Sequence, residues 1–169
     1  MINLVVMTCI WLVTSFDFYL INFLISSFKE AYNTAIASQL SEMSGQILSG
    51  FVFAFVGTKR GLFFSFGMSF CAGLFILFHG LQNQTHWTFL LQILIAKFGI
   101  ASAFNIIYLA HDGLFPVMFA ASSFGYCNFF ARTFTIASPL LARIEQPLPM
   151  IFFTAAAGTS SILALFIQV

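Results

Sequence analysis

The most informative stretch of the chain covers residues 87–109 and reads WTFLLQILIAKFGIASAFNIIYL. It is apolar over almost its whole length and reaches the roughly 20 helical residues that a bilayer requires. One charged residue, Lys97, stands near its middle. A charge at that depth costs at least about 2.5–3.5 kcal/mol on insertion scales, so it usually faces protein or a water-filled cavity. This stretch therefore predicts a membrane helix in which Lys97 has a partner.

The composition of the whole chain agrees with this interpretation. Hydrophobic residues make up 60% of the 169 residues, and charged residues make up only 7%. A soluble domain carries about 25% charged residues on average, so a water-soluble enzyme is excluded, as is a disordered chain. The net charge of +1 gives no basic patch, and we therefore expect no nucleic-acid partner.

Five further stretches have the same apolar character. At roughly 20 residues for each span, the chain holds about six helices. The predicted spans are 4–28, 34–56, 62–81, 87–109, 117–142 and 149–168. We therefore expect an all-α, multi-pass integral membrane protein whose residues 1–169 form a single six-helix transmembrane bundle in contact with the lipid bilayer. The sequence does not indicate which membrane.

Four ionisable residues lie inside the predicted spans, namely Asp17, Glu42, Lys97 and Arg132. Left unpaired, four such charges would cost on the order of 10 kcal/mol, which is comparable to the stability of a whole domain. One explanation is that they form two structural salt bridges that fix the register of the helices. The other is that they line a polar pathway for a solute or a coupling ion.

Other polar residues on the same helices favour the pathway. Gln46 lies one turn after Glu42, Asn105 follows Lys97 by two turns, and Asn128 precedes Arg132 by one turn. The candidate pathway residues are Asp17, Glu42, Gln46, Lys97, Asn105, Asn128 and Arg132. We find no HExxH or GxSxG arrangement and no metal-ligand spacing, so we expect no enzyme activity, no cofactor and no metal.

Small residues recur every four positions in the second span, at Ala37, Ser41, Gly45 and Ser49. Such runs let helix backbones approach each other closely in lipid. A weak internal symmetry also appears when the chain is divided at Gln84, because each half then carries charges in its first and second span but not in its third. Two three-helix repeats of inverted topology are a known device of secondary transporters.

Several motifs resemble the organic ion transporter branch of the major facilitator superfamily. The stretch from Lys97 to Tyr108 is similar to its tenth helix, and Leu114–Pro116 is similar to the cytoplasmic loop that follows. Gly125, Asn128, Arg132 and Pro139 resemble residues of its eleventh helix. Gly57, Lys59 and Arg60 resemble the basic cytoplasmic loop motif between its eighth and ninth helices.

This resemblance implies that the chain corresponds to the C-terminal six-helix half of a twelve-helix secondary transporter. Such a half would move a small organic solute by alternating access, together with a second six-helix half. In this branch the position of Arg132 tends to be basic in organic anion carriers, which favours an anionic solute. The alternative is that Glu42 or Asp17 neutralises Arg132.

The chain also departs from the family pattern at the cytoplasmic gate. Ala54 stands where the family has Asp, and Gly113, Val117 and Ala120 stand where it has Glu, Thr and Arg. The loss of these paired charges supports a second hypothesis, in which the protein is a degenerate, non-transporting membrane paralogue or an interaction protein.

Overall fold

The computed structural model describes residues 2–26, 31–80 and 87–167. In these ranges the chain forms seven α-helices and one π-helix, and it contains no β-strand. The elements in order are α1 (Ile2–Ser26), α2 (Ala31–Val56), α3 (Thr58–Phe75), η1 (Ile76–Gly80), α4 (Trp87–Leu114), α5 (Val117–Thr135), α6 (Ala137–Ala142) and α7 (Leu148–Ala164). The prediction of an all-α protein is thus confirmed for the part of the chain that the structure describes.

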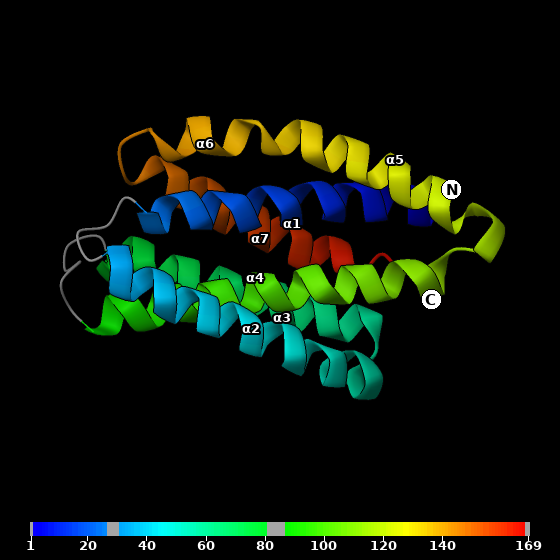
Figure 1. Cartoon of the computed structure of the whole chain (residues 1–169), viewed down its shortest axis with the longest axis horizontal. Helices are drawn as coiled ribbons and strands as arrows, with labels where there is room; N and C mark the ends of the chain where they lie inside the picture. The colour runs from blue at the N-terminus through cyan, green and yellow to red at the C-terminus, as the bar shows by residue number, and fades with distance from the viewer. Residues whose placement is uncertain (1, 27–30, 81–86, 168–169) are drawn as a thin grey trace.

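The helices lie side by side along the long axis of one elongated bundle (Figure 1). α1 and α4 run in opposite directions through it, and α1 begins toward the end of the bundle at which α7 ends. α4 packs against α2 and α3, whereas α1 packs against α5 and α7, and α3 contacts α7. The first helix of each predicted three-helix repeat therefore packs against the second and third helices of the other repeat.

The region expected to form one span over 117–142 consists of two helices. α5 ends at Thr135 and α6 begins at Ala137. Pro139 accounts for the break, because a proline has no N–H and its ring clashes with the carbonyl four residues earlier, which is that of Thr135. The Ser138 hydroxyl donates to this Thr135 carbonyl at 2.8 Å, so the carbonyl keeps a hydrogen-bond partner.

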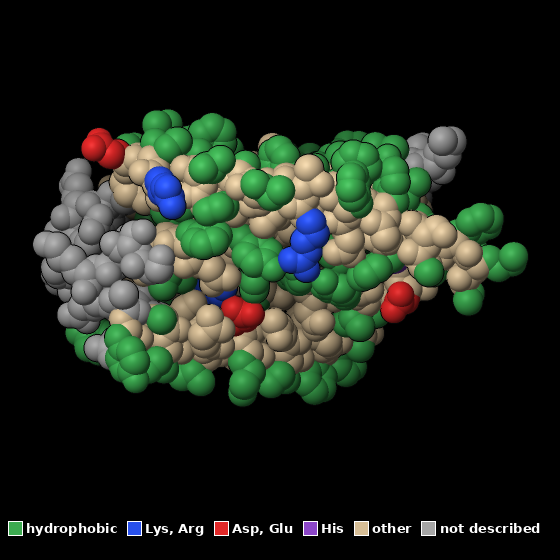
Figure 2. All heavy atoms as spheres, turned by 45° about the horizontal axis from the view of Figure 1, so that its top comes forward, with side chains coloured by type: hydrophobic (Ala, Val, Ile, Leu, Met, Phe, Trp, Pro, Cys, Tyr) green, Lys and Arg blue, Asp and Glu red, His purple; other side chains and the backbone are tan. Residues whose placement is uncertain are grey.

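Three helices of the described chain are long and apolar enough to cross a membrane, namely those over Asn3–Ile25, Thr58–Phe78 and Trp87–Leu114. α7 is apolar but shorter, with 17 residues. α2 is long enough at 26 residues, but serine, glutamine and glutamate side chains interrupt its middle. Large hydrophobic side chains cover much of the outer surface of the bundle (Figure 2), as expected of a membrane protein.

Two glycines allow the central helices to approach closely. A Cβ atom on Gly45 of α2 would lie 2.9 Å from the carbonyl oxygen of Phe98 in α4. A Cβ atom on Gly99 of α4 would lie 2.7 Å from the carbonyl oxygen of Ser65 in α3. α4 is therefore held between α2 and α3 at a spacing that no larger residue would permit, and this spacing fixes where Lys97 lies.

Candidate functional site

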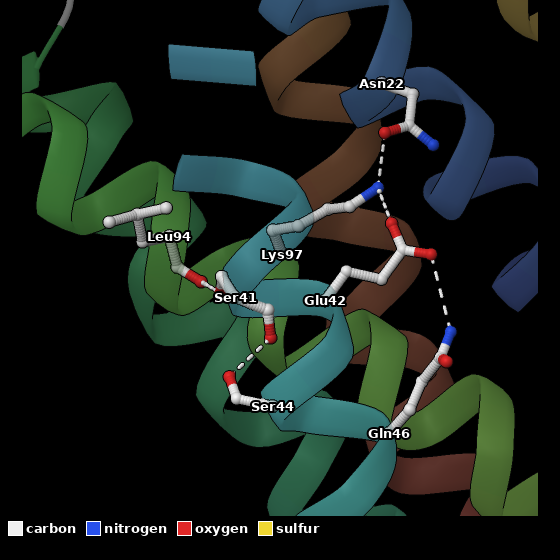
Figure 3. A network of polar contacts seen from close by, with 7 residues as sticks. All are labelled: Asn22, Ser41, Glu42, Ser44, Gln46, Leu94 and Lys97. Carbon is white, nitrogen blue, oxygen red and sulfur yellow. Dashed lines mark hydrogen bonds and ion pairs between the residues drawn. The ribbon is translucent and has the colours of Figure 1, made fainter. Parts of the chain in front are cut away.

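A cluster of polar contacts surrounds the buried Lys97 (Figure 3). The Lys97 Nζ atom of α4 forms an ion pair with Glu42 Oε2 of α2 at 3.0 Å. It also donates a hydrogen bond to Asn22 Oδ1 of α1, and it lies 4.1 Å from the centre of the Phe18 ring. Three helices from different parts of the chain thus meet at one ammonium group.

Burial differs between the two charged partners. The Lys97 side chain is fully buried, whereas 17% of the Glu42 side chain is exposed. Glu42 Oε1 accepts a hydrogen bond from Gln46 Nε2, one turn further along α2, at 3.4 Å. The lysine end of the ion pair is therefore inaccessible to solvent, whereas its carboxylate end is partly accessible. The neighbouring Gln46 side chain is exposed.

Hydrogen bonds between α2 and α4 hold this cluster in place. The Ser41 hydroxyl donates to the Leu94 carbonyl at 2.7 Å, and the Ser102 hydroxyl donates to the Gly45 carbonyl at 3.1 Å. Asn105 Nδ2 donates to the Gln46 carbonyl at 2.9 Å and to Ser49 Oγ at 2.8 Å. The four-residue spacing of small and polar residues on α2 is thus the basis of its contact with α4.

Arg132 on α5 lies in a different environment. Its side chain is exposed, and one Nη atom donates to the Tyr19 hydroxyl of α1 at 2.7 Å. The guanidinium carbon lies 5.8 Å from the centre of the Tyr19 ring. Within the described ranges no carboxylate pairs with Arg132, because Glu42 pairs with Lys97. Among the residues that the structure describes, the guanidinium contacts an aromatic side chain and forms no ion pair.

Asp17 is separate from both groups. It is fully buried in α1, and neither carboxyl oxygen has a hydrogen-bond partner among the described residues. The structure therefore contains one ion pair among the four mid-span charges, between Lys97 and Glu42, and not the two that the structural alternative requires.

The remaining predicted residues have simpler roles. Asn128 donates to the carbonyl of Phe124 in its own helix at 3.3 Å and does not join the cluster. Gly57 has a φ angle of 84° and caps the start of α3, which allows the tight turn after α2. Lys59 and Arg60 follow in the first turn of α3.

Sequence reasoning did not identify three residues of the site, namely Phe18, Tyr19 and Asn22 of α1. A signal was present, because Phe18 and Asn22 are four residues apart and therefore lie on one face of the helix. Phe18 gave no indication by itself, since phenylalanine is abundant throughout the chain.

The two basic residues differ in what they can do chemically. Lys97 is neutralised by Glu42, so the cluster adds no net charge to the bundle interior. Arg132 supplies a positive charge that a ligand can reach, and guanidinium groups pair well with carboxylate or phosphate oxygens. An acidic group on a ligand is the chemistry that could pair with Arg132.

No family model matches the chain. Over 95% of its length, the chain is 22% identical to a curated protein of Caenorhabditis elegans named "Putative transporter svop-1". The chain spans about a third of that relative, since the similarity covers 35% of its length. This distant similarity, together with the apolar helices, indicates a membrane protein related to transporters.

Proposed function

We propose that the chain is one six-helix half of a secondary transporter for a small organic anion and is not an enzyme. In this proposal it crosses the membrane six times as two inverted three-helix repeats. The reciprocal packing supports the repeats, because α1 contacts α5 and α7 just as α4 contacts α2 and α3. The opposite directions of α1 and α4 support the inversion.

The proposal that the solute is an anion rests on the environment of Arg132. Its side chain is exposed, it contacts the Tyr19 hydroxyl and ring, and no described carboxylate neutralises it. A cation in the low-dielectric interior of a membrane protein is stabilised by an opposite charge, which a bound anion would bring. The resemblance of the surrounding α5 residues to the organic ion branch of the major facilitator superfamily favours the same solute class.

Alternating access requires two bundles that move around one site. The proposed partner is therefore a second six-helix half, which would cover the exposed side chains of Gln46 and Arg132 and the partly exposed Glu42. Similarity to just over a third of a longer transporter-like relative is in keeping with such a half.

Binding of small organic ions to the chain in lipid vesicles tests this function. The probes are a panel of small organic anions and a panel of organic cations matched to them in size. We expect anions to bind preferentially, and Arg132→Ala to weaken this binding at least tenfold, because a charge-assisted hydrogen bond is lost. Arg143→Ala is the matched control, since Arg143 is an exposed arginine at the end of α6.

Equal binding of cations, or full anion binding by Arg132→Ala, contradicts the assignment of the solute class. If no member of either panel binds to the parent chain, the result favours the non-transporting membrane protein that the altered gate residues suggest.

A further inference from the structure

Asp17 is the feature that the proposed solute site does not explain. It lies in α1, a helix that is long and apolar enough to cross a membrane, it is fully buried, and both of its carboxyl oxygens lack a hydrogen-bond partner in the described chain. An ionised carboxylate buried without a partner is strongly destabilising, so such residues persist in membrane proteins mainly where they have a function.

Helix geometry places Asp17 away from the solute site. At 3.6 residues per turn, its side chain points about 140° away from Asn22 and about 160° away from Tyr19. Asn22 contacts Lys97 of α4, and Tyr19 contacts Arg132 of α5. Asp17 therefore belongs to a different side of α1 from the two groups that would face the solute.

The charged groups around α1 are already engaged elsewhere. α1 packs against α2, α4, α5, α6 and α7. Glu42 of α2 pairs with Lys97 of α4, Arg132 of α5 contacts Tyr19, and His111 of α4 lies 3.0 Å from the Ser123 hydroxyl. The other titratable side chains on these helices are Tyr32, Tyr108, Asp112, Tyr126 and Cys127, and α6 and α7 have none. None of the described groups bonds to Asp17.

From this burial and isolation we infer that Asp17 is a proton-binding site, separate from the solute site, whose occupancy controls the packing of α1. The protonated carboxyl is neutral and is compatible with the closed packing that the structure shows. When the proton leaves to water, the carboxylate requires hydration, and α1 must move to admit it.

Movement of α1 would reach the solute site directly. Tyr19, which contacts Arg132, and Asn22 and Phe18, which contact the Lys97 ammonium group, all lie within five residues of Asp17 on the same helix. A shift that hydrates Asp17 therefore displaces the Tyr19 contact with Arg132 and withdraws two of the groups around Lys97. In this last step the inference rests on the proposed function, since it couples proton release to solute binding.

Infrared spectroscopy of the chain in lipid vesicles tests proton binding without any solute. The carbonyl stretch of a protonated carboxyl is distinct from the bands of a carboxylate. We expect a protonated carboxyl band that disappears as the pH rises, that is absent in Asp17→Asn and that is retained in Asp17→Glu. Asp112→Asn is the matched control, because Asp112 is an exposed carboxylate near the end of α4.

Cys127 reports the movement of α1, because its buried thiol lies 3.4 Å from the Thr8 hydroxyl of that helix. The exposed Cys9 and Cys71 are replaced by serine, and thiol labelling is compared between the parent and Asp17→Asn at each pH. We expect severalfold faster labelling of the parent at alkaline pH and protected Cys127 in Asp17→Asn, since asparagine cannot ionise.

Two results would overturn the inference: a carboxyl band that persists in Asp17→Asn, or pH-dependent labelling of Asp17→Asn equal to that of the parent. Neither measurement uses the solute, so failure of the anion-binding test at Arg132 leaves these outcomes unaffected. Conversely, if the infrared test at Asp17 fails but the parent chain still binds anions through Arg132, the proton site is overturned and the proposed function stands.

Discussion

Lys97 and Asp17 are both fully buried in apolar helices, but their surroundings differ completely. Lys97 has Glu42, Asn22 and the Phe18 ring as partners from two other helices, whereas Asp17 has no hydrogen-bond partner among the described residues. A buried charge whose partners compensate it costs little stability, while a buried polar group without partners lowers stability. The comparison indicates that Lys97 is tolerated in the interior because its partners compensate it, and that Asp17 is retained for a function.

Replacement of Lys97 is the strongest way to test this difference. Lys97→Met leaves Glu42 and Asn22 without their partner, and we expect a loss of about 3–5 kcal/mol in the free energy of unfolding. Denaturant titration in detergent micelles measures it. The double variant Lys97→Met with Glu42→Leu should recover most of this loss, because no uncompensated charge remains. A loss below about 1 kcal/mol in the single variant would contradict the prediction that the packed bundle depends on the pairing of Lys97 with Glu42.

The second prediction concerns the spacing that brings Lys97 to Glu42. In Gly45→Ala the new Cβ atom would meet the Phe98 carbonyl oxygen at 2.9 Å, so α2 and α4 must separate. We expect a loss of about 1–3 kcal/mol in the free energy of unfolding. Gly50→Ala is the matched control on the same helix, since no atom lies within 4 Å of its Cβ position. That variant should gain about 0.5–1 kcal/mol from helix propensity.

The third prediction is a gain in the free energy of unfolding, whereas the first two are losses. Asp17→Leu replaces a partnerless carboxyl with an apolar side chain, and we expect the free energy of unfolding to rise by about 1–3 kcal/mol. The same denaturant titration, performed beside Lys97→Met, checks it. If both variants lose stability to a similar extent, Asp17 has a structural role and the contrast with Lys97 is wrong.

The smallest effect is expected at the edge of the cluster. Asn105→Ala removes hydrogen bonds to the Gln46 carbonyl and Ser49 hydroxyl, and interhelical hydrogen bonds in membrane proteins average about 0.6 kcal/mol. Asn128→Ala is the control, because Asn128 bonds only within its own helix in the described structure. An equal loss in the two variants would show that Asn105 does not tie α2 to α4.

The helical fold could be predicted from hydrophobicity and length, and the break in the span 117–142 could have been predicted from Pro139, which removes a backbone donor. The pairing of the charges was not predictable. Asp17 and Glu42 were equivalent candidate partners for Lys97 and Arg132, because sequence spacing defines the face of one helix but not the rotation of one helix against another. The roles of Phe18 and Tyr19 depend on this same rotation.

The packing of α1 has a consequence for biosynthesis. This helix leaves the ribosome before α4, α5, α6 and α7, yet it packs against all four of them. Contacts between residues so far apart in sequence form slowly, because a long loop must close before they are gained. α1 and its carboxyl therefore remain incompletely packed until α7 has been synthesised. Truncated translation products that end before α7 are expected to leave this face exposed and to be cleared by quality-control proteases.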